Sequence, residues 1–316
     1  VKSWTNDLLS LLQLAWTSGL DANWSNEGKL ENSGFDVHAT VKVLNLKDFR
    51  WEIGASVGHY KNEVTALPDN NRSFETDVYG ATIQTKVGQP VGLFYGYKTN
   101  GVYSTTQEAL ADGKYVVKEN GDKMYFQGGD MNFVDITPDG IIDENDRTVI
   151  GDPNPDIYGN IHTTFSWKNF TLSAVFNYSL GNDIYNYQRS LLEGGTYFLN
   201  QTTAMNGRWT TEGQQTNIPR VSYTDPMGNS RFSDRWIEDG SYLRMSNLTL
   251  SYYLPIQSTY LQGITIFGNV NNLFTITKYL GSDPDCAISG SILTQGIDRG
   301  LLGQGRSFSV GVNINL

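Results

Sequence analysis

The final segment of the chain, residues 306–316, alternates strictly between two kinds of side chain. The apolar set is Phe308, Val310, Val312, Ile314 and Leu316, and the small or polar set is Ser307, Ser309, Gly311, Asn313 and Asn315. Because successive side chains of a β-strand point to opposite faces, this pattern predicts a strand with one apolar and one polar face. A two-faced strand that ends on an apolar residue predicts the closing strand of a membrane β-barrel.

The same two-residue period recurs along the chain and predicts an antiparallel all-β protein of about ten strands. The clearest hairpin joins residues 157–167 to residues 170–180 through the two-residue turn Lys168-Asn169. Residues 2–13 are compatible with a strand or with a short helix. The other strands are expected at residues 35–43, 51–58, 79–87, 93–103, 247–252, 264–270 and 306–316.

The connections between these strands alternate in length, which distinguishes a membrane barrel from a soluble β-sandwich. Short connections cover residues 44–48, 88–92, 168–169 and 254–263, and long ones cover residues 61–77, 104–156, 181–240 and 275–305. Outer-membrane barrels have short periplasmic turns and long extracellular loops, whereas a Greek-key sandwich has no reason to sort its loops in this way. We therefore expect an antiparallel transmembrane β-barrel that ends on the short-turn side. Its long extracellular loops are expected to contain short helices near residues 106–111 and 187–193.

The composition agrees with a barrel and argues against several other classes of protein. The 316 residues carry 23 Lys and Arg against 33 Asp and Glu, a net charge of −10, without the basic clusters that bind nucleic acid. No apolar run approaches the length of a transmembrane helix, and only alternate residues of a barrel strand face the lipid bilayer. The 18 Tyr and 7 Trp suit the aromatic girdles of a barrel at the two membrane interfaces.

Six short motifs give the chain a family resemblance. They are NEGKLENSGF at residues 26–35, GQPVG at 88–92, DGIID at 139–143, GDPNPD at 151–156, RWIEDGSYLR at 235–244 and NVNNLF at 269–274. In this order they resemble the carboxyl-terminal part of the SusC/RagA-like TonB-dependent transporters of Bacteroidetes outer membranes. The resemblance implies a 22-stranded barrel with an amino-terminal plug and a TonB box, of which residues 1–316 would form about the last ten strands. No plug-like or TonB-box segment is evident in the sequence, and Leu316 stands where the family commonly ends in an aromatic residue.

The resemblance implies an outer-membrane nutrient importer that takes up glycans or oligopeptides. A SusD-like surface lipoprotein would cap it, and the TonB complex would act through the plug that this chain lacks. Two alternatives stay open from the sequence. One is a self-contained ten-stranded outer-membrane barrel with adhesive or enzymatic loops, and the other is a secreted β-rich carbohydrate-binding module. Nothing in the residues chooses between a glycan and a peptide substrate.

Signs of catalysis are weak, and we do not expect an enzyme. His38, His59 and His162 lie on different expected strands, and neither a nucleophile elbow nor a phosphate-binding loop occurs. The acidic pair Glu238-Asp239 is interpreted as a solvated or capping pair in a turn.

Residues 135–146 match the spacing of a calcium-binding loop. The oxygen ligands would come from Asp135, Thr137, Asp139, the carbonyl of Ile141, Asp143 and Asp146. Gly140 would provide the sharp turn and Ile142 an apolar anchor, although Asp146 replaces the usual bidentate Glu. The sequence predicts a structural Ca²⁺ that braces a long loop, and the alternative is an Asp- and Gly-rich turn without metal.

The second long loop is rich in aromatic residues that could contact a substrate. These residues are Tyr185, Tyr187, Tyr197, Phe198 and Trp209. Aromatic rings stack on sugar faces or on peptide side chains, and the neighbouring amides can bind a polar rim. The alternative is that these rings pack the loop against itself or against a partner lid.

Overall fold

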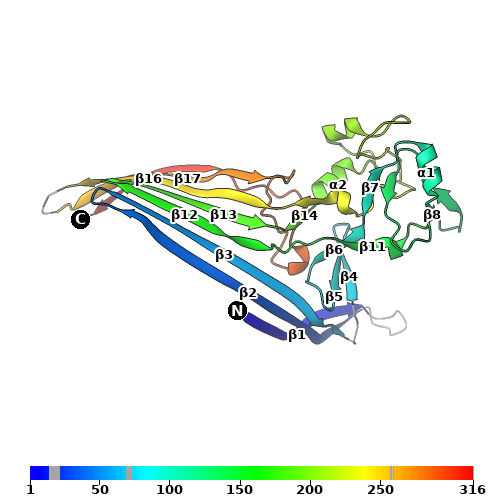
Figure 1. Cartoon of the computed structure of the whole chain (residues 1–316), viewed down its shortest axis with the longest axis horizontal. Coiled ribbons are helices and arrows are strands. Elements are labelled where there is room, and N and C mark those ends of the chain that lie inside the picture. Colours follow the sequence, from blue (N-terminus) through cyan, green and yellow to red (C-terminus); the bar gives the residue numbers. More distant parts are fainter. Residues whose placement is uncertain (14–21, 69–72, 257, 259, 316) are drawn as a thin grey trace.

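The computed structural model describes residues 1–13, 22–68, 73–256, 258 and 260–315. It consists of one long sheet and a body of connecting segments packed at one end of that sheet (Figure 1). Within the described residues no helix is both long enough and apolar enough to span a membrane.

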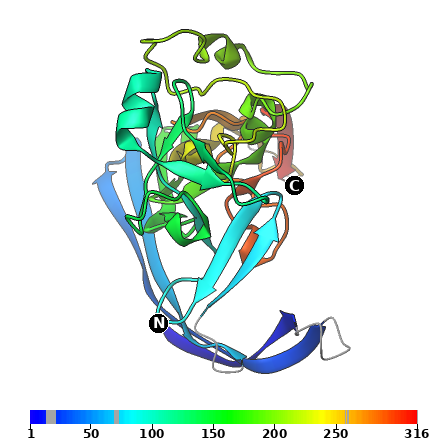
Figure 2. The same cartoon turned by 90° about the vertical axis from the view of Figure 1, so that its right-hand side faces the viewer.

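The long sheet has eight strands in the order β1-β2-β3-β12-β13-β16-β17-β19. Their bounds are β1 Lys2–Gln13, β2 Ala22–Asn45, β3 Phe49–Ala66, β12 Ile157–Trp167, β13 Phe170–Leu180, β16 Tyr242–Pro255, β17 Gly263–Thr277 and β19 Ser307–Asn315. All neighbours are antiparallel, so the predicted all-β antiparallel architecture is confirmed. Among the described strands β1 and β19 are the two edges and do not pair with each other, and the sheet is a curved, open wall (Figure 2).

The wall has one apolar and one polar face, as the alternation predicts. In β19 the apolar residues are exposed to 83% at Val310 and 72% at Phe308. Phe308 is paired with Val270 of β17, and Val312 is paired with Ile266. Such a continuous exposed apolar face is costly in water and suits a surface that contacts lipid.

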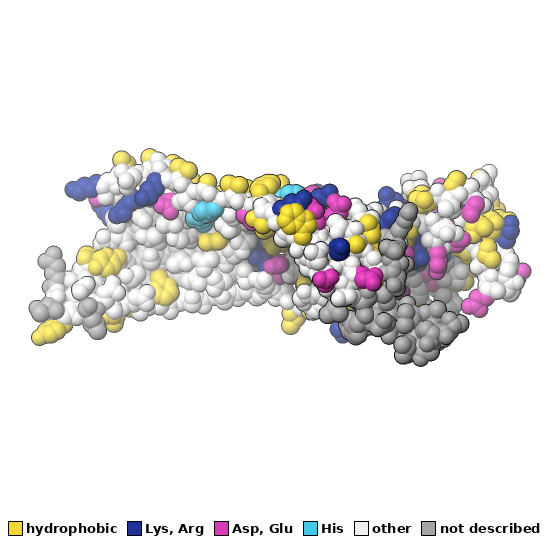
Figure 3. Space-filling view, turned by 90° about the horizontal axis from the view of Figure 1, so that it is seen from below, with side chains coloured by type: hydrophobic (Ala, Val, Ile, Leu, Met, Phe, Trp, Pro, Cys, Tyr) yellow, Lys and Arg dark blue, Asp and Glu magenta, His cyan; other side chains and the backbone are white. Residues whose placement is uncertain are grey.

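The opposite face carries small and polar side chains that bond to one another across strands. The Nδ2 group of Asn247 on β16 donates to the Oδ1 atoms of Asn269 at 2.7 Å and Asn271 at 2.9 Å, both on β17. Figure 3 views the molecule from a side on which uncharged polar side chains and backbone, in white, dominate the sheet. Basic side chains, in dark blue, gather there toward the short-turn end (Figure 3).

The ten-strand prediction is wrong in one respect, because residues 79–87 and 93–103 do not belong to the wall. They contribute β5 and β6 to a separate four-stranded sheet, and Thr99–Val102 forms the short strand β7 outside that sheet. The order of this sheet is β11-β6-β5-β4, with bounds Ser73–Val78 for β4, Ala81–Lys86 for β5, Leu93–Tyr97 for β6 and Arg147–Gly151 for β11. Its alternate apolar residues, such as Ile83 at 1% exposure, face a protein core and not lipid. Alternation of apolar and polar residues cannot show whether the apolar face of a strand contacts lipid or a protein core.

The predicted sorting of short and long connections to opposite ends of the strands is confirmed for the eight strands of the wall. Residues 46–48, 168–169 and 256–262 connect strands at one end, where the described chain also finishes at Asn315 (Figure 1). Three long excursions, residues 67–156, 181–241 and 278–306, all lie at the other end. Residues 2–13 form strand β1, and Leu316 lies outside the described residues.

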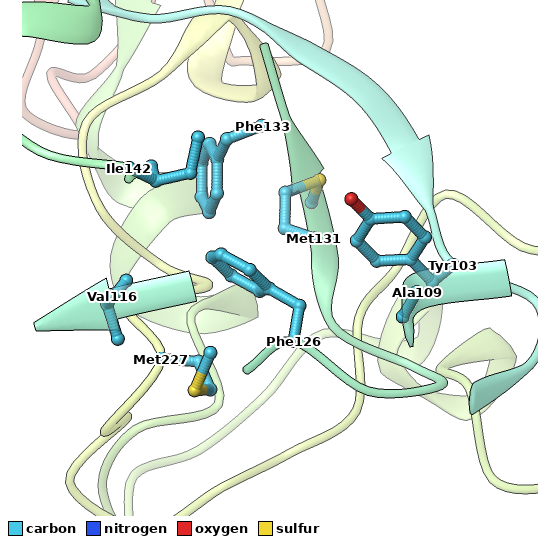
Figure 4. Packing of buried hydrophobic residues seen from close by; sticks show 8 residues of the cluster. All are labelled: Tyr103, Ala109, Val116, Phe126, Met131, Phe133, Ile142 and Met227. Carbon is cyan, nitrogen blue, oxygen red and sulfur yellow. The ribbon is translucent and has the colours of Figure 1, made fainter. Parts of the chain in front are cut away.

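The three excursions fold into a body with small elements of its own. These are α1 Thr106–Asp112, α2 Tyr187–Glu193, β7 Thr99–Val102, β8 Tyr115–Val117, β9 Lys123–Tyr125, β10 Met131–Phe133, β14 Asp183–Asn186, β15 Ile237–Asp239, β18 Ile297–Asp298 and the 3₁₀ turns η3 Glu144–Asp146, η4 Thr203–Gly207, η5 Asp234–Trp236 and η6 Ile292–Thr294. The two expected short helices are therefore present as α1 and α2. Phe126 lies at the centre of one core, between Phe133 and Met227 (Figure 4).

A glycine on β3 makes room for an aromatic contact across three strands on the polar face. His162 of β12 is paired with Gly54, and its ring stacks on His38 of β2 with centroids 5.7 Å apart. A Cβ atom at Gly54 would lie 2.3 Å from Cε1 of His162. The imidazole therefore occupies the space that any other residue at position 54 would fill.

Replacing Gly54 with valine should displace His162 and destabilise the wall by about 1–3 kcal/mol, as overpacking does. Adding His162→Ala should recover part of this loss, because the smaller side chain vacates the space. Both effects are measured as changes in the free energy of unfolding in urea. Heat-modifiable migration in detergent reports the folded fraction. Gly268→Val is the control, because a Cβ there meets no atom within 4 Å. Equal losses at Gly54 and Gly268 would contradict the role of His162.

Candidate functional site

A small sheet beside the end of the wall joins the second and third excursions, and a shared core adds the first. Strand β14 of the second excursion pairs antiparallel with β15 and parallel with β18, which belongs to the third excursion. Tyr185 of β14 and Ile297 of β18 lie in one core with Phe94 of the first excursion. Because all three excursions share this core, their side chains are held in fixed positions relative to one another.

A buried ion pair reinforces the contact between the first two excursions. Asp130 is fully buried, and Arg220 donates to its two carboxylate oxygens at 2.7 and 3.0 Å. Asn229 also donates to Asp130, at 2.9 Å. A buried carboxylate with several donors is stable in place, whereas loss of one partner would leave an uncompensated charge.

Helix α2 carries a second charged network, which surrounds Arg189. Its Nε atom donates to Glu193 at 3.0 Å, and its Nη1 atom donates to Glu238 at 2.5 Å. Asn186 caps α2 by accepting from the Arg189 backbone N–H, and it also donates to Glu238. Glu238 is therefore an ion-pair partner of Arg189 with a side chain only 9% exposed, and its interpretation as a solvated or capping acid was wrong.

Arg235 lies beside this network but has a different environment. Its Nη2 atom donates to the carbonyl of Glu193 at 3.2 Å, and its guanidinium lies over the Trp236 ring at 4.2 Å. Burial, together with the nearby positive charge of Arg189, lowers the pKa of Arg235 to about 10. The sequence singled out residues 235–244 only as a family motif, so it did not identify this cation.

A cavity of about 440 Å³ opens where the three excursions meet. It is lined by Thr99, Gly101, Met131, Arg189, Glu193, Ala204, Asn217, Ile218, Arg235 and Leu280. Its volume is in the range of small-molecule sites, and its walls combine apolar side chains with a few polar groups. A second cavity, of about 400 Å³, lies on the wall near its short-turn end and is lined in part by Lys42, Arg50 and Glu52.

The predicted calcium loop, residues 135–146, has part of the geometry that a metal loop requires. Asp135 accepts from the Gly140 N–H at 2.8 Å through Oδ2, and Asp139 accepts from the Ile141 N–H at 2.8 Å. Gly140 has a φ of 77°, so it makes the sharp turn expected of it. Ile142 is 3% exposed and anchors the loop in the core.

Other carboxylates of this loop are occupied by the loop itself. Asp146 is fully buried and accepts from Ile136, Thr137 and the Asp143 N–H. Asp143 accepts from the N–H and the side chain of Asn145. Within the described part of the chain, no three His, Cys, Asp or Glu groups gather so that they could hold a metal ion. The Oδ1 atom of Asp135 is buried without a hydrogen-bond partner, so Ca²⁺ binding stays a prediction.

The five aromatic residues predicted to contact substrate lie in different surroundings. Tyr185 is 3% exposed, and its hydroxyl donates to the carbonyl of Tyr79, so its ring is part of the core. Tyr187 is half-buried beside Tyr79. Trp209 donates to the carbonyl of Ser104, and its ring fills the space above Gly129. For these three positions the structure shows local packing.

Tyr197 and Phe198 remain exposed at the surface of the second excursion. Phe198 is 92% exposed and stacks on Tyr223, with ring centroids 5.2 Å apart. Tyr197 is 66% exposed. These rings are accessible to a ligand or a partner, so their predicted role stays open.

Comparison with known proteins relates the whole chain to one group of receptors. It is 31% identical to the TonB-dependent receptor P3 of Formosa agariphila, a match covering 98% of this chain and 31% of that protein. It is 26% identical to the TonB-dependent receptor SusC of Bacteroides thetaiotaomicron, over 98% of this chain and 29% of that protein. The chain therefore spans about a third of the length of these relatives, and no family model matches it.

A solved structure of the RagAB peptide transporter has the same fold over 99% of this chain. The TM-score is 0.77 at 23% sequence identity, and the match covers 32% of that chain. A structure of the RagAB peptide importer in its open-open state gives a TM-score of 0.75. Since RagAB is a β-barrel transporter, this likeness confirms that the long sheet is barrel wall.

Calcium should bind residues 135–146 if the unpaired oxygen of Asp135 is a ligand. Isothermal titration with CaCl₂ should then show heat of binding, and the loop should gain protection from proteolysis. Asp135→Asn should abolish the binding, because the amide removes the charge while its oxygen can still accept from Gly140. Asp122→Asn, in a separate exposed turn, should bind as the wild type does. Absence of both heat and protection in the wild-type protein would exclude the site.

Tyr185→Ala should destabilise the body far more than Phe198→Ala does. Removing the buried Tyr185 ring should cost the body about 3–5 kcal/mol, in the range of large-to-small core substitutions. Removing the exposed Phe198 ring should change stability by less than about 0.5 kcal/mol. Hydrogen exchange of residues 181–241 measures both changes. Similar losses at the two positions would show that Phe198 also has a structural role.

Proposed function

The resemblance to the SusC/RagA-like TonB-dependent receptors is confirmed over nearly the whole chain, and on this premise we propose that the chain forms barrel wall of an outer-membrane nutrient importer. The observation that carries this proposal is the two-faced wall with all three long excursions at one end. Its apolar face suits lipid, and its polar face suits a water-filled or plugged lumen. The excursions would lie on the outer side of the bacterial outer membrane.

The partners follow from the same proposal. A SusD-like lipoprotein would cap the body formed by the excursions, and the TonB complex would act through a plug supplied by sequence outside residues 1–316. The solute would be a glycan or an oligopeptide. The solved relative RagAB is described as a peptide transporter, which gives the peptide class a precedent within the fold. A Ca²⁺ ion in residues 135–146 would have a structural role, and transport, not catalysis, would be the activity.

The two alternative functions are less consistent with the wall. A self-contained ten-stranded barrel would need its edge strands to meet, whereas β1 and β19 of the described sheet do not pair. A secreted carbohydrate-binding module would expose the apolar face of the wall, including Phe308 and Val310, to water. Large exposed apolar surfaces of this kind are uncommon in soluble monomers.

Uptake by cells that carry this receptor tests the proposal. Labelled oligosaccharides and labelled oligopeptides should be supplied separately to wild-type cells and to cells that lack the receptor. We expect uptake of one class to depend on the receptor and to stop when a protonophore collapses the proton-motive force, because TonB-dependent transport is energised from the inner membrane. The class that is taken up identifies the substrate.

One control and one contrary outcome make the result decisive. A porin substrate in the same cells should enter regardless of the protonophore, which shows that the protonophore does not block passive entry across the outer membrane. Receptor-dependent uptake that persists without the proton-motive force would contradict TonB-dependent import and indicate a passive pore.

A further inference from the structure

Arg235 is a cation without a carboxylate partner at the junction of the three excursions. Among the described residues no Asp or Glu oxygen lies within ion-pair distance of its guanidinium, and its Nη1 atom is buried without a hydrogen-bond partner. Its side chain donates to a neutral backbone carbonyl, that of Glu193. A partly buried charge with neutral partners is unfavourable unless something else compensates it.

The neighbouring Arg189 differs from Arg235 because carboxylates of the protein compensate its positive charge. It lines the same cavity but is held by Glu193 and Glu238, so its charge is neutralised within the protein. The guanidinium groups of Arg189 and Arg235 both lie over the Trp236 ring, at 5.5 and 4.2 Å. Two cations thus contact one aromatic ring, while the two carboxylates of the network both contact Arg189. Arg235 therefore lines the cavity as a cation that neither of these carboxylates pairs with.

The cavity beside Arg235 has the size and composition of a ligand subsite. Its volume of about 440 Å³ would hold one sugar ring or one to two amino-acid residues. Asn217 and Thr99 add hydrogen-bonding groups, and Ile218, Met131 and Leu280 add apolar walls. The lining residues come from all three excursions, so the cavity exists only in the assembled body.

We propose that this cavity binds the carboxylate of a ligand and that Arg235 is its counter-ion. The planar guanidinium suits a carboxylate better than any other side chain does. The carboxylate could belong to a uronic acid in a glycan or to the carboxyl terminus of a peptide. The identity of the ligand as a transported solute rests on the function proposed above, but the binding itself does not require transport.

Calorimetry on the detergent-purified receptor that contains this chain tests the proposal. The probes are D-glucuronate against D-glucose, and trialanine against its carboxyl-terminal amide. We expect at least one carboxylate probe to bind and its neutral counterpart to bind at least tenfold more weakly. The probe that binds distinguishes the uronate source from the peptide source. Because no transport step is measured, failure of import would leave this result intact.

Variants connect the binding to Arg235. Arg235→Gln should weaken the binding of the carboxylate probe about tenfold or more, and Asn217→Asp should weaken it as well, because it adds a negative charge to the cavity without altering Arg235. Arg208→Gln is the matched control, since Arg208 lies in the same excursion outside the cavity. Melting curves of the unliganded variants report whether each one is folded.

Three results would overturn the proposal. One is equal binding of charged and neutral probes, another is absence of binding by both carboxylates, and the third is unchanged binding in folded Arg235→Gln. If Arg235→Gln does not fold, unchanged binding by Asn217→Asp decides against the proposal in its place.

Discussion

Every part of this structure depends on the hydrogen bonding of the backbone in the long sheet. In a bilayer no water is available to bond to exposed N–H and C=O groups, so a spanning segment must satisfy them within the protein. Strands β12 and β13 do so in unbroken register from Ile157 opposite Leu180 to Trp167 opposite Phe170. Side chains on such a ladder can only alternate between two faces, which separates lipid contact from lumen contact. Irregular segments, whose backbone groups need other partners, are confined to the two ends of the strands.

This constraint explains which parts of the fold were predictable from the sequence. The ranges expected for the central hairpin, residues 157–167 and 170–180, coincide with β12 and β13, because alternation and a tight turn are local properties. Residues 79–87 alternate equally well but form β5, whose Ile83 packs in a protein core. What surrounds a strand is decided by residues far away in the chain, and a local pattern does not contain that information.

The candidate site was harder to predict because it is made of distant contacts. The turn at Gly140 was expected from its spacing, and it is present, with Asp135 accepting from the Gly140 N–H and Asp139 accepting from the Ile141 N–H. By contrast, Glu238 and Asp239 are adjacent in sequence and differ in role. Glu238 binds Arg189, which lies 49 positions earlier, whereas the exposed Asp239 accepts from the backbone N–H of nearby Ser241. Likewise, Tyr185 became a core residue and Phe198 a surface residue, although both lie in one aromatic-rich loop.

The pairing of β14 with both β15 and β18 has a consequence for how this surface can vary between related receptors. Insertions or deletions near Tyr185 or Ile297 would shift the register of a sheet that the second and third excursions share, and would disturb the core that the first excursion also joins, so these positions tolerate little change in length. The segment around Phe198 is outside that sheet and can change length freely. Variation in ligand preference should therefore concentrate in the outlying segments, while the junction beneath them remains a constant platform.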